Sequence, residues 1–172
     1  DVLIGTRDPD ATVARAAADD MGNPTYAEWA AQHPRVRLGS FAEAAGQAEV
    51  VVNATNGGAS LDVLALAGAD ALAGKVIIDI ANPLDFSQGF PPHLTVSNTD
   101  SLAEQIQRAL PGTFVVKSLN TVNASVMVDP SLVEGEDYPA GIFNRAQILT
   151  GAVQNYIPGV RLTGSLRIAP AI

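Results

Sequence analysis

Asp1–Pro9 reads DVLIGTRDP, and this segment indicates the type of fold most directly. Its three apolar residues, Val2–Ile4, favour a buried parallel strand, and Gly5–Arg7 favours a loop directly after it. Asp8 suits the N-cap of a helix, and Pro9 suits the first helical position, where its missing N–H costs nothing. We therefore predict a strand, a turn and a helix in this order.

The same alternation of strand and helix continues to Thr121, and it predicts an α/β fold with a doubly wound parallel sheet. Further segments rich in β-branched or other apolar residues predict strands at Val36–Leu38, Glu49–Thr55, Val76–Ile80 and Phe114–Leu119. Helix-forming composition and terminating Gly or Pro residues predict helices at Asp10–Met21, Phe41–Ala48, Leu61–Ala73 and Leu102–Leu110. Two capping boxes are expected, Thr25 with Glu28 and Ser101 with Glu104.

The composition argues against several classes of protein. The 172 residues are enough for one hydrophobic core. A net charge of −8 argues against a nucleic-acid partner, and no apolar run of about 18 residues is present to suggest a membrane span. The absence of Cys excludes disulfides and thiolate chemistry, and with only His33 and His93 available we expect no metal site. These features favour a cytoplasmic protein.

The end of the first strand carries a signal for a cofactor. In a dinucleotide-binding fold, the loop after the second strand meets the adenosine ribose. An acidic residue there binds the 2′-hydroxyl of NAD, whereas Arg accommodates the 2′-phosphate of NADP. Thr6 and Arg7 occupy this place, so the sequence favours NADP. An ordinary surface turn remains the alternative.

A dinucleotide-binding fold normally begins with one more strand and a G-x-G-x-x-G turn. That motif does not occur in the 172 residues, and the sequence starts on a strand with Asp1. A βαβ unit spans about 30 residues. We therefore expect a Rossmann-like sheet that lacks its first β-α unit, or else a different α/β fold.

Two later turns are candidate parts of a binding site. Thr55–Gly58 lies between a strand and a helix, where free N–H groups and the helix dipole favour a pyrophosphate. An empty crossover turn is the alternative. Asn82 and Pro83 follow the strand Val76–Ile80, at the edge of the sheet where ligands bind. Lys117 could face a phosphate or extend to the strand edge as a structural residue.

The last part of the chain differs from the rest. All 18 acidic residues lie within Asp1–Asp137, and none lies in Tyr138–Ile172. We therefore divide the chain into a dinucleotide-binding domain over 1–137 and a divergent C-terminal tail over 138–172.

Five segments together resemble a known family: GTRDP (5–9), VVVNAT (50–55), VIIDIANPLD (76–85), SNTDSLAEQIQRALP (97–111) and VVKSLNTVNASVMVDP (115–130). They are similar to the NADPH-dependent F420 reductase (F420:NADP oxidoreductase) family. The resemblance implies hydride transfer between NADPH and the deazaflavin coenzyme F420, a small-molecule partner, with no catalytic acid or base, and a possible homodimer. It places cofactor contacts at Thr6, Arg7, Thr55, Asn56, Gly57, Gly58, Asn82, Pro83, Asn120 and Thr121.

Two other functions remain open from the sequence. A non-catalytic NADP-binding or sensor module would keep the fold and bind without turnover. An enzyme acting on a sugar phosphate or nucleotide would show no preference between NADPH and NADH.

Overall fold

The computed structural model describes residues 1–18, 22–124 and 127. The strands are β1 (Val2–Thr6), β2 (Val36–Ser40), β3 (Val50–Asn53), β4 (Val76–Asp79), β5 (Leu84–Asp85), β6 (His93–Leu94) and β7 (Phe114–Lys117). The helices are α1 (Pro9–Ala14), α2 (Tyr26–Ala31), α3 (Phe41–Gln47), the 3₁₀ turn η1 (Gly57–Ala59), α4 (Ser60–Ala67), α5 (Ala69–Leu72) and α6 (Leu102–Ala109). The predicted tail over 138–172 lies outside the described residues, so the domain division stays a prediction.

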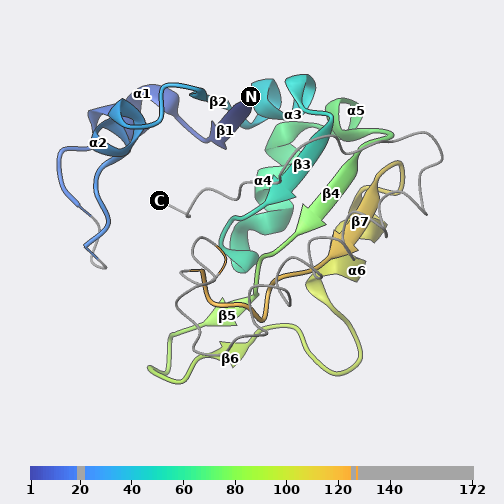
Figure 1. Cartoon of the computed structure of the whole chain (residues 1–172). Helices are drawn as coiled ribbons and strands as arrows, with labels where there is room; N and C mark the ends of the chain where they lie inside the picture. The colour runs from blue at the N-terminus through green and yellow to red at the C-terminus, as the bar shows by residue number, and fades with distance from the viewer. Residues whose placement is uncertain (19–21, 125–126, 128–172) are drawn as a thin grey trace, which may run out of the picture.

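The strands form parallel sheets, as the alternation of elements predicts. β3, β4 and β7 pair in the order β3-β4-β7, with Asn53 opposite Asp79 and Asp79 opposite Lys117. β1 pairs with β2 in a separate parallel sheet. Figure 1 shows β3, β4 and β7 side by side, with β1 and β2 at one end of the molecule. All carboxyl ends of β3, β4 and β7 therefore lie at one edge.

The core lies around β4, whose four residues are all buried. Ile77 packs with Leu64 and Leu72 from α4 and α5 and with Ile106 from α6. Burial of one such side chain contributes about 1.5–3 kcal/mol. The strand predicted over Val76–Ile80 is thus confirmed, and its buried end can hold polar residues in fixed positions.

Helix α3 bridges the two parallel sheets. It packs against β1 and β2 on one side and against α4 and α5 on the other. Its start is a capping box in which Ser40 and Glu43 bond each other's backbone N–H. Near its end, the ammonium of Lys75 donates to the carbonyls of Ala45 and Gly46, at 2.5 and 3.3 Å.

A cavity of about 130 Å³ lies between β1 and β3. Leu3 and Gly5 line it from β1, Val51 and Asn53 line it from β3, and helices α3 and α4 supply further side chains. Within the part of the chain that the structure describes, β2 is the only strand paired with β1, and β4 is the only one paired with β3. Each sheet therefore turns one unpaired edge toward this cavity.

This arrangement corrects two predictions of burial. No residue of β1 is buried, and Val2 is 41% exposed. In β3 only Asn53 is buried, and Val52 is 36% exposed. The apolar sequence predicts burial on both faces, but among the described residues each strand pairs with a neighbour on one side only. The predicted parallel direction of both strands is confirmed.

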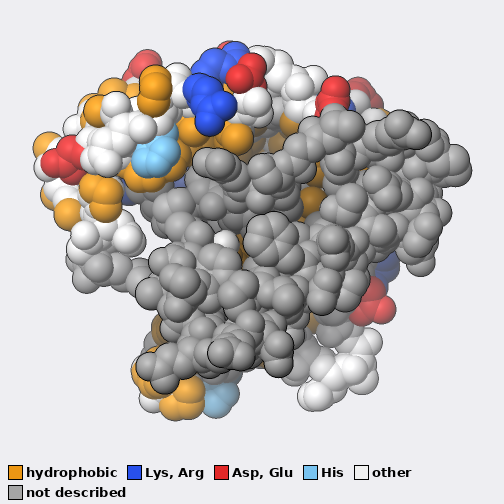
Figure 2. Space-filling model, in the orientation of Figure 1, with side chains coloured by type: hydrophobic (Ala, Val, Ile, Leu, Met, Phe, Trp, Pro, Cys, Tyr) orange, Lys and Arg blue, Asp and Glu red, His pale blue; other side chains and the backbone are white. Residues whose placement is uncertain are grey.

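Helix ends differ from the prediction where a local conformation interrupts the pattern. The helix expected over 10–21 ends at Ala14, because Arg15 adopts an extended conformation. The helix expected over 61–73 is divided by Gly68, whose φ of +92° is left-handed. Leu84–Asp85 and His93–Leu94, for which the sequence predicts no strands, pair as the antiparallel hairpin β5–β6. Figure 2 shows hydrophobic side chains at the end of the molecule where this hairpin lies.

The capping predictions are largely confirmed. The carboxylate of Asp8 accepts the N–H of Ala11 at 2.9 Å, and Thr25 with Glu28 forms a complete capping box. Ser101 differs, because its own N–H donates to Asp100 instead of Glu104. Among the described helices, none is long and apolar enough to cross a membrane.

Candidate functional site

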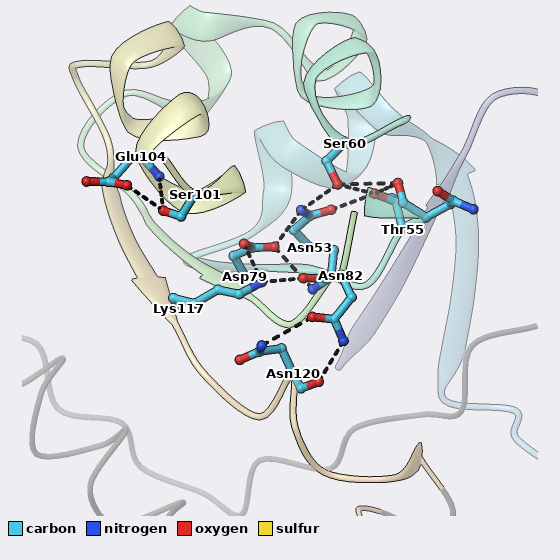
Figure 3. Close-up of polar contacts among 11 residues, drawn as sticks. Asn53, Thr55, Ser60, Asp79, Asn82, Ser101, Glu104, Lys117 and Asn120 are labelled. Carbon is cyan, nitrogen blue, oxygen red and sulfur yellow. Dashed lines mark hydrogen bonds and ion pairs between the residues drawn. The ribbon is translucent and has the colours of Figure 1, made fainter. Parts of the chain in front are cut away.

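Polar side chains meet at the carboxyl ends of β3, β4 and β7 (Figure 3). Asn53 Nδ2 donates to Asp79 Oδ1 at 2.8 Å, and the Lys117 ammonium lies 2.9 Å from Asp79 Oδ2. Asp79 is completely buried, whereas the Lys117 side chain is 29% exposed. Opposed residues of neighbouring strands thus form one chain of hydrogen bonds across the sheet.

The network continues into the turn after β3. Asn53 Nδ2 also donates to Ser60 Oγ at 3.0 Å, and Thr55 Oγ1 donates to Asn53 Oδ1 at 2.7 Å. The hydroxyls of Thr55 and Ser60 are 3.0 Å apart. Ser60 is fully buried at the start of α4. The buried amide of Asn53 therefore fixes both ends of the Gly-rich turn.

The Gly-rich turn is partly satisfied by its own residues. Asn56 accepts the Gly58 N–H through its side chain at 2.9 Å and the Ala59 N–H through its carbonyl at 2.8 Å. The expectation of a turn with bare N–H groups is therefore wrong for these two residues. The Asn56 side chain acts as a local cap, a role that its position in an N-G-G turn permits.

The turn touches the loop after β4 through Gly57. A Cβ built on Gly57 would overlap the carbonyl of Asn82 and lie 2.5 Å from the nitrogen of Pro83. Only glycine allows the two backbones this close approach. Gly57 and Pro83 are both buried, whereas Asn56 and Gly58 are exposed. Two separately predicted parts of the site are thus in direct contact.

Asn82 and Asn120 join the loops after β4 and β7. Asn82 Nδ2 donates to the backbone carbonyl of Asn120 at 2.6 Å, and Asn120 Nδ2 donates to Asn82 Oδ1 at 3.2 Å. Both residues are partly buried. Thr121, the next residue, is exposed, and no side-chain bond within the described part of the chain attaches it to this pair.

Thr6 and Arg7 lie at the carboxyl end of β1. The Thr6 hydroxyl lies 2.9 Å from the hydroxyl of Thr12 in α1. The exposed Arg7 makes no hydrogen bond or ion pair with any described residue, so its guanidinium is available to an anion. Gly5 and Thr55 line the same cavity, which places this end beside the Gly-rich turn. No bond recorded among the described residues joins Thr6 or Arg7 to Asn82 or Asn120.

The sequence did not single out the buried members of the network, Asn53, Ser60 and Asp79. A signal was present, because Asn53 and Asp79 are polar residues that end apolar strands, and buried polar groups need partners. Lys117, for which a phosphate contact and a structural role were both open, directs its ammonium to Asp79 and to the Ala81 carbonyl. The structural role is therefore the one observed.

No group of three His, Cys, Asp or Glu side chains among the described residues could hold a metal ion. The carboxylates with perturbed pKa values lie in caps and turns. The N–H of Ser87 lowers the pKa of Asp85, and Arg108 lowers the pKa of Asp100.

Comparison with known proteins identifies the family of the chain. The model of the family described as NADP oxidoreductase, coenzyme F420-dependent, matches residues 1–83. A solved structure from Arthrobacter sp. FB24, provisionally assigned as an F420-dependent NADP reductase, has a TM-score of 0.74 and 50% sequence identity. This match covers 88% of the present chain and 69% of the other.

A second solved structure, a hypothetical protein from Sinorhizobium meliloti, has a TM-score of 0.53 and 19% identity. The match covers 89% of this chain and 78% of the other chain, and it supports the fold alone. No curated protein matches the chain. The Rossmann-like α/β fold predicted from the sequence is confirmed by the parallel sheets and the first of these structures. The chain belongs to the family of NADP oxidoreductases that depend on coenzyme F420.

Proposed function

We propose that the protein transfers a hydride between NADPH and the deazaflavin ring of coenzyme F420. The observation that carries the proposal is the contact of Gly57 with Asn82 and Pro83. It joins a Gly-rich turn to a polar loop at the carboxyl edge of a parallel sheet, where ligands bind in such folds. Membership of the family and the Arthrobacter structure support the same reaction.

In this proposal, the cofactor lies along the edge from β1 to β7. Arg7, exposed and without a partner among the described residues, binds the 2′-phosphate, and Thr6 adds a hydroxyl. A fork of guanidinium N–H groups suits a phosphate, so we expect a preference for NADPH over NADH. The turn that contains Thr55, Asn56 and Gly58 lies against the pyrophosphate and ribose of the cofactor.

The nicotinamide end lies beside Asn82 and Pro83, with Asn120 and Thr121 on the far wall. The close packing of Gly57 against Asn82 and Pro83 holds the two loops together beneath this end of the site. Asn82 and Asn120 hold each other by two hydrogen bonds, so their amides are fixed before a ligand arrives. A preformed site of this kind reduces the entropy lost on binding.

The protein needs no general acid or base for this reaction. When bound, the nicotinamide and the deazaflavin supply both reacting carbon atoms, so the chemistry is that of the cofactors. The contribution of this chain is to bind the two rings, to orient them and to exclude water. The buried side chains of Asn53 and Asp79 support the loops without facing a substrate.

The test has two parts and uses the chain as it stands. Calorimetric titrations with NADPH and with NADH measure the cofactor preference. Absorbance of the deazaflavin, recorded with NADPH and enzyme, measures turnover. Selective NADPH binding with reduction of F420 supports the proposal. Selective binding without turnover favours a non-catalytic NADP-binding module, and equal affinity for NADPH and NADH contradicts the assignment of Arg7.

A further inference from the structure

We propose that Asp79 and Lys117 are positioning residues, which hold the Ala81–Pro83 segment in place for the nicotinamide half of the cofactor. The inference rests on the proposed function for its ligand, and on the described contacts for its geometry. Nothing in the sequence or in the comparisons assigns this role to either residue.

The pair holds Ala81 at both of its backbone polar groups. Asp79 Oδ1 accepts the Ala81 N–H at 3.2 Å, and the Lys117 ammonium donates to the Ala81 carbonyl. Ala81 is itself 4% exposed. With both groups fixed, the peptide that leads into Asn82 has one orientation.

The orientation of this peptide determines which residues the side chain and the carbonyl of Asn82 contact. From its position after Ala81, the Asn82 side chain bonds Asn120, and its carbonyl faces Gly57. Further along, the Pro83 carbonyl accepts the Thr95 N–H at 2.8 Å. A rotation at Ala81 would therefore disturb the contacts on both sides of the proposed nicotinamide pocket.

Lys117 has little capacity left for a phosphate. Asp79 and the Ala81 carbonyl take two of its three ammonium donors. The buried carboxylate is satisfied in turn by Asn53, Ala81 and Lys117, and among the described residues no buried side-chain polar atom lacks a partner. The polar groups of this cluster are thus bonded mainly to one another rather than directed to a ligand.

A contribution to stability alone does not explain the pair. A buried ion pair often stabilises a fold no more than well-packed apolar residues would, because both charges must be desolvated. Valine and isoleucine fill the neighbouring positions of β4 and β7. The advantage that the charges bring here is directional: they orient one peptide group at the base of a loop.

The decisive variant is the double substitution Asp79→Asn with Lys117→Met. It removes both charges, so no unpaired charge remains buried, and it removes the donor to the Ala81 carbonyl. Lys117→Met alone serves as a second variant. The matched control is Lys75→Met. Lys75 is the other lysine of the chain and also donates to carbonyls, but it lies just before β4, whereas Lys117 is the last residue of β7.

The first readout needs no ligand. Amide hydrogen exchange is followed at Ala81, Leu84 and Thr95, and at Ile77 and Ile78 within β4. In the double variant we expect exchange to accelerate about tenfold or more at the first three amides, with little change in β4, because only the loop is released. Unchanged exchange at Ala81, or equal acceleration throughout β4, would overturn the proposal.

The second readout separates the two halves of the cofactor. Binding of NADPH is compared with binding of adenosine 2′,5′-bisphosphate, which carries the 2′-phosphate and lacks nicotinamide. We expect the double variant to lose about tenfold or more in NADPH affinity and to bind the bisphosphate as the wild type does. Equal loss for both ligands, or the same pattern in Lys75→Met, contradicts the positioning role. If wild-type protein binds neither ligand, the proposed function fails, and hydrogen exchange alone decides the role of the pair.

Discussion

The backbone of Gly57 lies against the carbonyl of Asn82, in a space too small for a single methyl group. The two residues are far apart in the sequence and belong to different loops, one after β3 and one after β4. Their contact makes the Gly-rich turn and the N-P loop one continuous surface. The first prediction concerns this contact.

Gly57→Ala is expected to force the two loops apart. Overpacking of a tight site costs about 1–3 kcal/mol, so the free energy of unfolding in urea should fall by that amount. Affinity for NADPH should fall as well. Gly58→Ala is the control for stability alone, because a Cβ there meets only the Asn56 side chain, at 3.3 Å. Equal stability of the two variants would mean that the loops adapt independently.

Arg7→Ala is expected to lower the affinity for NADPH and to leave the affinity for NADH unchanged. A charge-assisted bond to phosphate contributes roughly 1.5–3 kcal/mol, or about 10- to 150-fold in affinity. NADH lacks the 2′-phosphate, so its affinity should stay the same. Arg15→Ala, which removes an exposed arginine just beyond α1, should change neither titration. A loss of the same size for both cofactors would refute the specificity assigned to Arg7.

The two asparagines of the proposed pocket should differ in importance. Asn82→Ala removes two hydrogen bonds, because the Asn82 side chain both donates to Asn120 and accepts from it. Asn120→Ala removes only one, because the stronger bond goes to its backbone carbonyl. We expect Asn82→Ala to be the more destabilising by about 1 kcal/mol in urea unfolding. The reverse order would show that the backbone bond does not form.

Stability should decline below about pH 4.5 through the two complete capping boxes. Bonds from the N–H and hydroxyl of Thr25 lower the pKa of Glu28, and those of Ser40 lower the pKa of Glu43, both from 4.5. Because the pKa values are lower in the folded state, this stabilisation is complete above pH 4.5. It is lost as the pH falls through the lowered values.

The measurement is urea unfolding as a function of pH, for the wild type and for the double variant Glu28→Gln with Glu43→Gln. Glutamine keeps the shape of the cap and removes the ionisation, so the variant should show a flatter dependence across this range. An identical slope would assign the acid sensitivity to other carboxylates.

The existence and parallel direction of β1, β2, β3, β4 and β7 could be predicted from the sequence, because apolar runs separated by caps and turns are local signals. Asp8 and Thr25 are examples in which a side chain next to its partner determines a helix start. Burial could not be predicted in the same way. Val52 belongs to a run as apolar as that of Ile77, yet it is more than a third exposed because of which strands lie beside it.

The candidate site was predictable in outline and not in its connections. Asn82 and Gly57 are residue types that occur where a loop approaches a ligand or another backbone. The sequence around each of them does not indicate that the two residues contact each other. The bond between Asn53 and Asp79 joins residues 26 positions apart, through strand pairing that only the fold establishes. For Lys117, the sequence could not decide between a phosphate contact and a structural role, because its partner Asp79 lies on a neighbouring strand.

The unpaired edges of β1 and β3 have a consequence for how the molecule responds to a ligand. No ladder of backbone bonds connects these two strands within the described residues, and α3 packs against β1 and β2 on one side and against α4 and α5 on the other. The layer that carries Arg7 can therefore open at a lower free energy than the layer that carries Asn82. A ligand held at both ends links the two layers, so its binding should suppress opening of β1 far more than that of β4. The bound cofactor would then connect the β1–β2 sheet to the β3–β4–β7 sheet.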